Sequence, residues 1–326
     1  MSRVDVVVPC YNYGRFVRQA AESVLSQEGI HVRVLIIDDA STDDSEAVGR
    51  QLAAEDPRVE YRRHATNTGH LRVHNEGIDW LTGDYCMLLS ADDMVTPGAF
   101  ARAAAVMDRH PEVVLTYGRA IETPEPRPEQ YTPVPDEWKV RGGRAVIETM
   151  VRLWNNIVPT PTAIGRTATQ KAIGGYDLAL PHSGDLEMWL RYAARGAVAV
   201  TDARQAYYRR HAVNMSKGYT GARECTQLQE AFDAFFEKDA HLVPAVGELK
   251  ALSDRGLAVQ ALYVANDLFN AGDVRRCDDF LRLAAARWPG IREHRGWRRL
   301  AWKRRFGAGV VTCLRRLCGR PAQATR

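Results

Sequence analysis

The 326-residue sequence lacks several features that would place it in a familiar class. No apolar run reaches the roughly 18 residues that a membrane-spanning helix needs, and Met1 to Pro9 lacks the apolar core of a signal peptide. The six cysteines form no CxxC pair and are too sparse for a disulfide scaffold. The phosphate-binding patterns GxGxxG, after the first strand, and GxxxxGK[ST] are also absent. We therefore expect free thiols in a reducing cytoplasm, no spanning helix, and neither of these two modes of phosphate binding.

The chain as a whole has little excess of one sign of charge, with 44 basic and 40 acidic residues and a formal net charge of +4. This charge is unevenly distributed. Residues 291–326 hold eleven Lys or Arg and a single acid, Glu293, so this segment carries +10 and the preceding 290 residues carry −6. A uniformly basic protein that coats nucleic acid is thereby disfavoured, and we expect no nucleic-acid partner.

The first 120 residues alternate short apolar runs with helical patterns, which is typical of a mostly parallel sheet flanked by helices. We therefore predict an α/β fold, and 45% hydrophobic residues suffice for its core. Ligands bind such sheets beyond the carboxyl ends of the strands, so the chemistry is expected in the loops after Val8, Ile37 and Leu89. The predicted strands are Val4–Val8, Val32–Ile37, Arg58–Arg62, Tyr85–Leu89 and Val113–Tyr117, and the predicted helices are Phe16–Gln27, Asp44–Glu55, Leu71–Leu81 and Gly98–Arg109.

The pattern changes twice in the rest of the chain. Five prolines in residues 123–135 indicate a surface connection, and a mixed region over 140–216 contains an amphipathic helix at Leu186–Ala194. Past Glu224 the pattern is helical. Gly256–Pro289 faintly resembles a single tetratricopeptide-like hairpin, which we interpret as a helical appendage because one copy cannot stack into an array.

Two loops at the ends of predicted strands are acidic. Asp38 and Asp39 close the second strand, and Asp92 and Asp93 follow the fourth. A carboxylate in this position can accept hydrogen bonds from a ligand. Hard carboxylate oxygens also suit Mg²⁺ or Mn²⁺, which hold phosphate-bearing substrates through few protein ligands.

Helix capping is the structural alternative for parts of these loops. Ser41 and Asp44 have the spacing of a capping box, which would satisfy the first amides of the following helix. Adjacent acids in loops are also commonly solvated or act as caps. Neither interpretation accounts for two acidic loops at equivalent strand ends.

Seven motifs follow one another along the chain: Val6-Val7-Val8-Pro9-Cys10-Tyr11-Asn12; Ile37-Asp38-Asp39-Ala40-Ser41-Thr42-Asp43; Asn67-Thr68-Gly69 with Asn75-Glu76-Gly77; Gly83-Asp84-Tyr85 with Ala91-Asp92-Asp93; Gly174-Gly175-Tyr176-Asp177; Gly184-Asp185-Leu186-Glu187-Met188-Trp189-Leu190-Arg191; and Tyr208-Arg209-Arg210-His211 with Asn214 and Ser216. In this order they resemble the family 2 glycosyltransferases, which have the glycosyltransferase A fold. The resemblance covers residues 3–216, about two thirds of the chain.

The resemblance also implies a domain organisation. Residues 1–216 correspond to the catalytic domain, with a nucleotide-sugar-binding half over 1–120 and an acceptor half over 121–216. Residues 217–326 form a helical C-terminal extension. Its last part, 291–326, is the basic amphipathic tail.

The family pattern implies a role for several residues in binding the donor. Pro9, Tyr11 and Asp39 would line the pocket for the nucleotide base and ribose, with Asp39 accepting a hydrogen bond from the uracil ring N–H. Asn67 and Asn75 would belong to the same substrate-binding set.

The second acidic loop is assigned to the diphosphate and its metal. Asp92 would contact the ribose or diphosphate, and Asp93 would ligate a divalent metal, Mn²⁺ or Mg²⁺. His211 would complete the metal or diphosphate site. The alternative for His211 is a loop histidine in a basic surface stretch beside Arg209 and Arg210.

Asp185 matches the catalytic base of the family. From the sequence alone it could also be the N-cap of the helix Leu186–Ala194, and the two roles are compatible because a helix N-terminus holds a carboxylate still. Three positions depart from the family pattern: Ser90 and Gly184 replace acids, and His74 replaces an arginine. The identity of the transferred sugar is therefore the property that the family resemblance specifies least.

These assignments imply an inverting, metal-dependent glycosyltransferase that moves a sugar from a nucleotide-diphosphate donor, a UDP-sugar, to a glycan or lipid-linked acceptor. Two alternatives stay open. A non-catalytic sugar-nucleotide-binding scaffold subunit would be expected to have lost Asp93 or Asp185, and both are present. A sugar-1-phosphate nucleotidyltransferase would need a glycine-rich loop with a basic residue where the sequence has Pro9-Cys10-Tyr11-Asn12.

The basic tail suggests a membrane contact. Its arginines alternate with eight apolar residues, as in an interfacial helix on anionic lipid, where each basic residue contributes about 1 kcal/mol. The alternative is a solvated basic end or a helix packed on the protein. We expect cytoplasmic localisation with peripheral membrane contact, and expect deletion of residues 291–326 to abolish binding to anionic vesicles. The apolar residues are Trp297, Leu300, Trp302, Phe306, Val310, Val311, Leu314 and Leu317.

Overall fold

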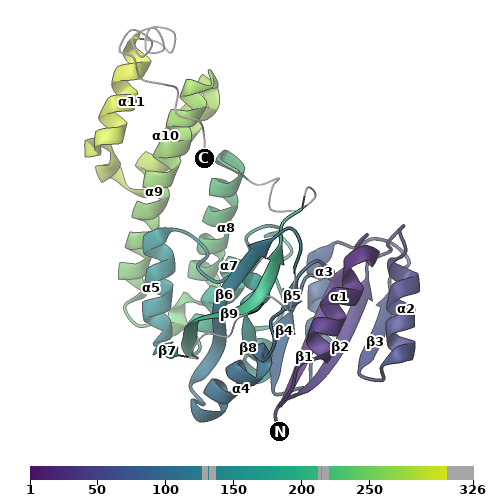
Figure 1. Cartoon of the computed structure of the whole chain (residues 1–326). Helices are drawn as coiled ribbons and strands as arrows, with labels where there is room; N and C mark the ends of the chain where they lie inside the picture. The colour runs from purple at the N-terminus through teal and green to yellow at the C-terminus, as the bar shows by residue number, and fades with distance from the viewer. Residues whose placement is uncertain (127–130, 132–136, 212–213, 215–219, 307–326) are drawn as a thin grey trace. The chain divides into compact units, whose positions relative to one another are not determined.

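The structure is a computed structural model of the chain and describes residues 1–126, 131, 137–211, 214 and 220–306 (Figure 1). The chain divides into two compact units. The first comprises Met1–Met150, Asn155–Gly218 and Glu230–Pro244, and the second comprises Val151–Trp154, Tyr219–Gln229 and Ala245–Arg326. All residues that we assigned to the site lie in the first unit.

A nine-stranded sheet, counted over the described residues, forms the centre of the first unit (Figure 1). Its strand order is β3-β2-β1-β4-β8-β6-β9-β5, and β7 pairs with β9. The strands are β1 (Arg3–Cys10), β2 (His31–Asp38), β3 (Val59–Arg63), β4 (Tyr85–Leu88), β5 (Met94–Val95), β6 (Val113–Thr123), β7 (Trp138–Arg141), β8 (Ile164–Arg166) and β9 (Ala197–Arg209).

The helices of the chain alternate with these strands and then follow them (Figure 1). They are α1 (Gly14–Leu25), α2 (Ser45–Glu55), α3 (His70–Trp80), α4 (Ala99–Arg109), α5 (Gly143–Leu153), α6 (Thr167–Ile173), α7 (Gly184–Ala193), α8 (Ala222–Lys238), α9 (Val246–Asn270), α10 (Val274–Arg287) and α11 (Arg295–Phe306).

The N-terminal half has the predicted α/β architecture, and every predicted strand and helix in it is confirmed within a few residues. Strands β3, β2, β1 and β4 pair in parallel. Residues 4, 6 and 8 of β1 face one side and pack with α1 residues such as Val17 and Ala20, whereas Val7 faces α3 on the other side, where Gly77 leaves room for it. A parallel sheet with helices on both faces buries both sides of each strand, which explains the nearly continuous apolar runs.

The second half of the sheet is mixed rather than parallel. Strand β8 is antiparallel to both β4 and β6, and β9 is parallel to β6 but antiparallel to β5 and β7. Strands β5 and β8, of two and three residues, are too short to produce a periodic signal in the sequence. The predicted helix Leu186–Ala194 is confirmed as α7, whereas most of the proline-rich segment 123–135 lies outside the described residues.

The second unit is helical, as predicted for the region past Glu224. Helices α9 and α10 form the predicted hairpin, and their small and apolar residues, including Ala258, Ala265 and Cys277, pack together. Ile291 and Leu300, from the basic tail, are buried in the same core. None of the helices in the described part of the chain has the length and apolarity to cross a membrane.

The cysteines of the described residues agree with the prediction of free thiols. Cys10, Cys86, Cys225 and Cys277 are all buried and unpaired with one another. Cys313 and Cys318 lie outside the described residues.

Candidate active site

The loops that follow β1 and β2 are joined by hydrogen bonds at the carboxyl edge of the sheet. Asn12 donates its backbone N–H to Ser41 Oγ at 2.9 Å and accepts the N–H of Thr42 through its side chain at 2.8 Å. Asn12 and Ala40 both have positive φ, 57° and 62°. Left-handed backbone costs about 1–3 kcal/mol at a residue such as alanine and is found preferentially at functional sites.

The capping box predicted from Ser41 and Asp44 is wrong. Helix α2 begins at Ser45, and Asp44 makes no side-chain cap. The first amide of α2 is instead satisfied by Asp43, whose Oδ1 accepts the Ser45 N–H at 3.0 Å. The Ser41 hydroxyl oxygen accepts the backbone N–H of Asn12.

The two buried acids at the end of β2 have different hydrogen-bond partners. Asp38 is fully buried and accepts hydrogen bonds from the Ser41 N–H, the Tyr61 hydroxyl at 2.8 Å and the Arg63 guanidinium at 2.5 Å. Its charge is therefore matched inside the protein. Asp39 is the member that is directed toward the loop before α3.

Asp39 is buried and is held by the start of α3. Its Oδ1 accepts the Thr68 N–H at 2.8 Å, and its Oδ2 accepts the Gly69 N–H at 2.8 Å. Gly69 has φ of 91°, which a residue with a side chain rarely adopts, so a glycine is needed to present this amide. Burial raises the pKa of Asp39, but these donors and His64 outweigh it and hold the pKa below its usual range.

The other predicted donor-binding residues differ in solvent exposure and in the hydrogen bonds of their side chains. Tyr11 is 46% exposed, Pro9 is half-buried at the end of β1, and Asn67 is exposed. The side chain of Asn75, in contrast, accepts the Tyr176 N–H at 2.6 Å and donates to the Tyr176 carbonyl at 3.0 Å. In the structure, Asn75 thus fixes the backbone of Tyr176.

The second acidic loop meets the end of β9. Asp92 and Asp93 are both buried, and His211 Nε2 lies 2.8 Å from Asp92 Oδ2. The backbone N–H of Arg209 donates to Asp93 Oδ1 at 2.9 Å, and its guanidinium donates to the Asp92 carbonyl. Folding thereby brings His211 and Arg209 to the loop of Asp92 and Asp93, more than a hundred positions earlier in the chain.

This cluster suits a divalent cation. Burial and then the neighbouring Asp92 charge raise the pKa of Asp93, although Arg209 and Arg210 oppose this, so a cation bound beside the two carboxylates would stabilise their charged forms. His211 Nδ1 is buried and has no hydrogen-bond partner among the residues that the structure describes. Among residues 1–126, 137–211 and 220–306, no three His, Cys, Asp or Glu side chains form a complete metal site. A Mg²⁺-type ion is usually held by one or two carboxylates plus substrate phosphates, so an incomplete protein set fits this group.

Asp185 lies in the first turn of α7 rather than at its cap. Ser183 is the N-cap residue, so the N-cap alternative for Asp185 is wrong. The Thr160 hydroxyl donates to Asp185 Oδ2 at 2.6 Å, and the Tyr176 hydroxyl also donates to this carboxylate. Burial raises the pKa of Asp185, and the two hydroxyl hydrogen bonds partly oppose this.

The start of α3 connects Asp39 to the surroundings of Asp185. Gly69 donates to Asp39, and the next residue, His70, lies 3.0 Å through Nε2 from the Pro181 carbonyl. The positive charge of a protonated His70 would lower the pKa of Asp185, so the two side chains are electrostatically coupled. The donor and acceptor motifs therefore meet at one edge of the sheet.

Four contacting residues were not assigned from the sequence. Thr160 and Tyr176 hold Asp185, Arg209 holds Asp93, and His64 holds Asp39. Tyr176 and Arg209 lie inside the motifs given above, so these two had a signal in the sequence. His64 had none.

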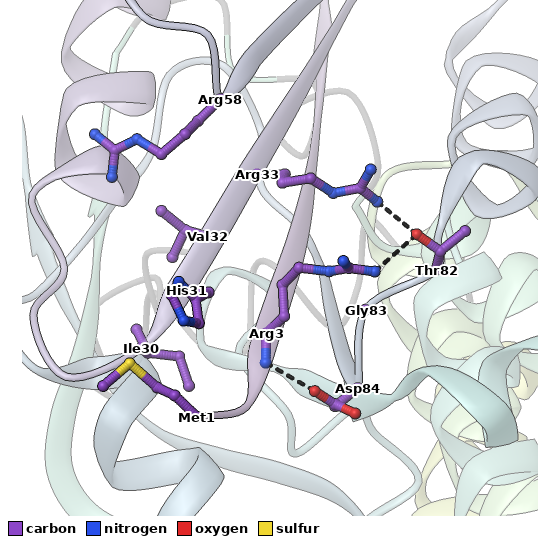
Figure 2. A pocket seen from close by; sticks show the side chains of 10 residues that line it. All are labelled: Met1, Arg3, Ile30, His31, Val32, Arg33, Arg58, Thr82, Gly83 and Asp84. Atoms are coloured by element: carbon purple, nitrogen blue, oxygen red, sulfur yellow. Dashed lines mark hydrogen bonds between the residues drawn. The ribbon is translucent and has the colours of Figure 1, made fainter.

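A separate pocket of about 550 Å³ lies at the opposite edge of the sheet (Figure 2). It is lined by the first residues of β1 and β2, including Arg3 and His31. Its arginines are compensated: Arg33 pairs with Asp5 at 2.6 Å, and Arg58 pairs with Asp56 at 2.7 Å. Because its bases are neutralised and it lies at the amino ends of the strands, we place the active site at the carboxyl edge instead.

Comparisons with known proteins show which family the chain belongs to. The sequence profile of Glycosyl transferase family 2 matches residues 5–168. The chain is 26% identical over 204 residues to the uncharacterized protein MT1568 of Mycobacterium tuberculosis, covering 60% of this chain and 63% of that protein. It is 27% identical over 202 residues to the putative glycosyltransferase EpsE of Bacillus subtilis, covering 60% of this chain and 68% of that protein. The match thus spans slightly less than two thirds of the mycobacterial relative.

Solved structures are similar in fold. The S. aureus TarS structure in complex with UDP-GlcNAc gives a TM-score of 0.54 at 16% identity, covering 89% of this chain and 92% of that chain. The mannosyltransferase PcManGT from Pyrobaculum calidifontis, in complex with GDP-Man and Mn²⁺, gives 0.51 at 15% identity and covers 88% of each chain. Since the profile match takes in half of the chain and the fold agrees, the protein belongs to glycosyl transferase family 2.

Proposed function

We propose that this protein is an inverting, metal-dependent glycosyltransferase that moves a sugar from a UDP-sugar to a hydroxyl group of a glycan or lipid-linked acceptor. The observation that carries the proposal is the grouping of three elements at the carboxyl edge of one sheet. These are the buried carboxylate of Asp39, which accepts hydrogen bonds, the Asp92–Asp93–His211 cluster, and the carboxylate of Asp185, to which hydroxyl groups donate.

The donor class is supported by the hydrogen-bonding capacity of Asp39. An ionised carboxylate only accepts hydrogen bonds, so it favours a base that presents a ring N–H. Uracil and guanine both do so, and the similar TarS and PcManGT structures contain UDP-GlcNAc and GDP-Man respectively. Asp39 Oδ2, with the single donor Gly69 in the structure, retains the capacity to accept a second N–H.

The chemistry is assigned to Asp185 and the second acidic loop. Asp185 would take the proton of the acceptor hydroxyl as the new bond to the anomeric carbon forms and the bond to the diphosphate breaks, and general-base catalysis of this kind contributes about 10²–10⁴-fold. A single base and an in-line displacement invert the anomeric centre. Asp93 and His211 would hold the divalent cation, whose charge stabilises the departing diphosphate.

A donor panel tests this proposal directly. We expect the protein to release nucleotide from one or more UDP- or GDP-sugars in the presence of Mn²⁺ or Mg²⁺ and an acceptor, and to lose this activity with a chelator. The measurement is nucleotide release by a coupled assay, with thermal unfolding in parallel to detect donor binding. Donor binding without release from any sugar would favour the scaffold alternative, and formation of a nucleotide sugar from a sugar phosphate would favour the nucleotidyltransferase.

We also propose that the basic tail contacts anionic lipid, with the protein cytoplasmic and peripheral. Its described part, α11, exposes Trp302 by 50% and Phe306 by 48%, and their rings are 5.0 Å apart. Arg298, Arg299 and Arg305 are exposed on the same helix. Aromatic rings flanked by arginines suit an interface of lipid headgroups. Residues 307–326 of the tail lie outside the described residues.

The structure changes the experiment that tests the membrane contact. Deleting residues 291–326 would remove Ile291 and Leu300 from the core of the second unit, so the deletion is expected to unfold this unit. We instead expect the double variant Arg298→Glu/Arg299→Glu to bind anionic vesicles at least tenfold more weakly, because each basic residue contributes about 1 kcal/mol. Vesicle co-sedimentation is the measurement.

A matched control uses two other arginines of the second unit. Arg275 and Arg276 are exposed on α10, so Arg275→Glu/Arg276→Glu makes the same change of charge on a different helix. This variant is expected to bind vesicles like the wild type. Equal weakening by both variants would mean that only net charge matters, and the proposal of an α11 contact would then be abandoned.

A further inference from the structure

His64 lies between two carboxylates beside the predicted base-binding residue. It follows β3, and its side chain is 19% exposed. Nδ1 is 2.8 Å from Asp39 Oδ1, and Nε2 is 2.7 Å from Oε2 of Glu76, which lies on α3. The imidazole thus connects the end of β2 to α3 through Asp39 and Glu76.

The geometry specifies the protonation state of this ring. Ionised carboxylates have no hydrogen to donate, so both ring nitrogens must carry a proton for both contacts to be hydrogen bonds. His64 is therefore an imidazolium in this arrangement. Burial lowers the pKa of His64, but the hydrogen bonds with Glu76 and then Asp39 outweigh it and raise the pKa above its usual value.

The other charged groups that face this cluster are already paired. Arg62 on β3 pairs with Glu60 at 2.7 Å and lies 3.5 Å from Glu76 Oε1. Arg63 on β3 pairs with Asp38 at 2.5 Å and with Glu46 of α2 at 3.1 Å. The nearest neutral group is the Thr68 hydroxyl, 3.2 Å from His64 Nδ1.

We propose that His64, as the imidazolium, is a positioning residue that holds Asp39 for the nucleotide base and makes donor binding depend on pH. The inference rests on the proposed function, because that function gives Asp39 its role. The Asp39 carboxylate accepts from Thr68, Gly69 and His64, and of these donors only His64 can be switched off by a change of pH within the physiological range.

Deprotonation has a defined structural consequence. A neutral imidazole has one N–H, so either Asp39 or Glu76 then faces a nitrogen lone pair at less than 3 Å and must move. Glu76 is partly exposed and competes with Asp39 for the remaining proton. Donor affinity is therefore highest when His64 is protonated and falls as the pH rises through its pKa.

The test measures binding rather than turnover. We expect the affinity of the wild-type protein for UDP with Mg²⁺, measured by calorimetry, to fall about tenfold between about pH 6 and pH 9. His64→Gln is expected to bind about tenfold more weakly at the lower pH and to lose most of this pH dependence. His110→Gln is the matched control, because His110 is a surface histidine 3.1 Å from the carboxylate of Glu112 and is expected to leave both quantities unchanged.

A second variant separates positioning from a merely structural role. In Glu76→Gln, the amide N–H can donate to Nε2 of a neutral His64, which keeps its Nδ1–H for Asp39. Affinity at high pH is therefore expected to be restored, and the pH profile should flatten while binding is retained. A purely structural role for Glu76 would instead weaken binding at every pH, and this result would overturn the proposal.

Nuclear magnetic resonance provides a readout that does not depend on the activity. Long-range ¹H–¹⁵N spectra of the full chain at about pH 6.5 should show His64 with both ring nitrogens protonated. A single protonated nitrogen, or a His64→Gln variant with the pH profile of the wild type, would overturn the inference while nucleotide binding persists. Absence of UDP and GDP binding at every pH, with both nitrogens protonated, would instead overturn the proposed function, and with it the link to donor binding.

Discussion

The Asp185→Asn variant is expected to lose sugar transfer by about 10²–10⁴-fold in kcat while its affinity for the donor nucleotide stays within about twofold. Asparagine has the shape of aspartate, and its amide oxygen can still accept the hydrogen bond from the hydroxyl of Thr160. It cannot take a proton from an acceptor hydroxyl. The measurement is steady-state nucleotide release with acceptor, together with calorimetry for the donor.

The dependence of the transfer rate on pH tests the role of Asp185 independently. Burial raises the pKa of Asp185, and only its carboxylate form acts as a base. The rate of the wild-type protein is therefore expected to rise with pH through this raised pKa, and the residual rate of Asp185→Asn should lack this limb.

Asp177→Asn is the matched control for this variant. Asp177 lies in the same region of the chain and pairs with Lys238, at 2.5 Å, rather than with Thr160 or Tyr176. Its removal is expected to change kcat by less than about threefold, since its partner Lys238 is exposed and such an ion pair contributes little. If Asp185→Asn kept more than a tenth of the wild-type rate, Asp185 would not be the base.

The second large effect is expected for Asp93→Asn, which should lower metal-dependent transfer by 10²-fold or more, since a bound cation contributes several kcal/mol to charge stabilisation. Asparagine can still accept the Arg209 N–H that Asp93 accepts at 2.9 Å. It removes the negative charge beside Asp92. The measurements are nucleotide release over a range of Mn²⁺ concentrations and thermal unfolding with UDP and Mn²⁺.

The Asp93→Asn substitution is expected to lower the activity without lowering the folding stability of the metal-free protein. Burial and the charge of Asp92 raise the pKa of Asp93, so in the metal-free protein this carboxylate costs folding free energy above its usual pKa. We expect the metal-free Asp93→Asn variant to be at least as stable as the wild type near neutral pH. Since a general loss of structure would lower activity and stability together, this combination identifies a functional carboxylate.

The other acidic loop supplies the control for Asp93. Asp44 is exposed and caps no helix amide, so Asp44→Asn removes the same charge without altering a buried contact. This variant should keep the metal dependence of the wild type. Full activity of Asp93→Asn, or activity that a chelator does not reduce, would exclude a metal role for Asp93.

Much of the N-terminal half could be predicted because each of its strands and helices is marked by a pattern within its own short segment of sequence. Strands β1 to β4 are buried on both faces, which requires apolar runs, and the helices between them show their own periodicity. Asp92 and Asp93 were singled out because two acidic loops follow apolar runs at equivalent strand ends. Strand β9 could not be predicted, because its pairing with β5, β6 and β7 depends on residues far away in the chain.

Residue roles were harder to predict than residue positions. The sequence placed Ser41 in a capping box and left Asp185 as a candidate N-cap. In the structure Asp43 accepts the first amide of α2, and Ser183 occupies the N-cap position of α7 without a side-chain cap hydrogen bond. Capping depends on the backbone angles at the helix start, which spacing alone does not specify. His64 had no motif because its partners, Asp39 and Glu76, are separated from it by 25 and 12 positions.

The sequence by itself determined the α/β class, the acidic loops at strand ends and the glycosyltransferase family, since each depends on residue type and order along the chain. Only the tertiary structure decided which carboxylates are neutralised internally, as Asp38 is by Arg63, and which are buried beside a second carboxylate, as Asp93 is beside Asp92. The physical reason is that a carboxylate's charge is balanced by whatever lies within a few ångströms, and folding brings those groups together from distant parts of the chain.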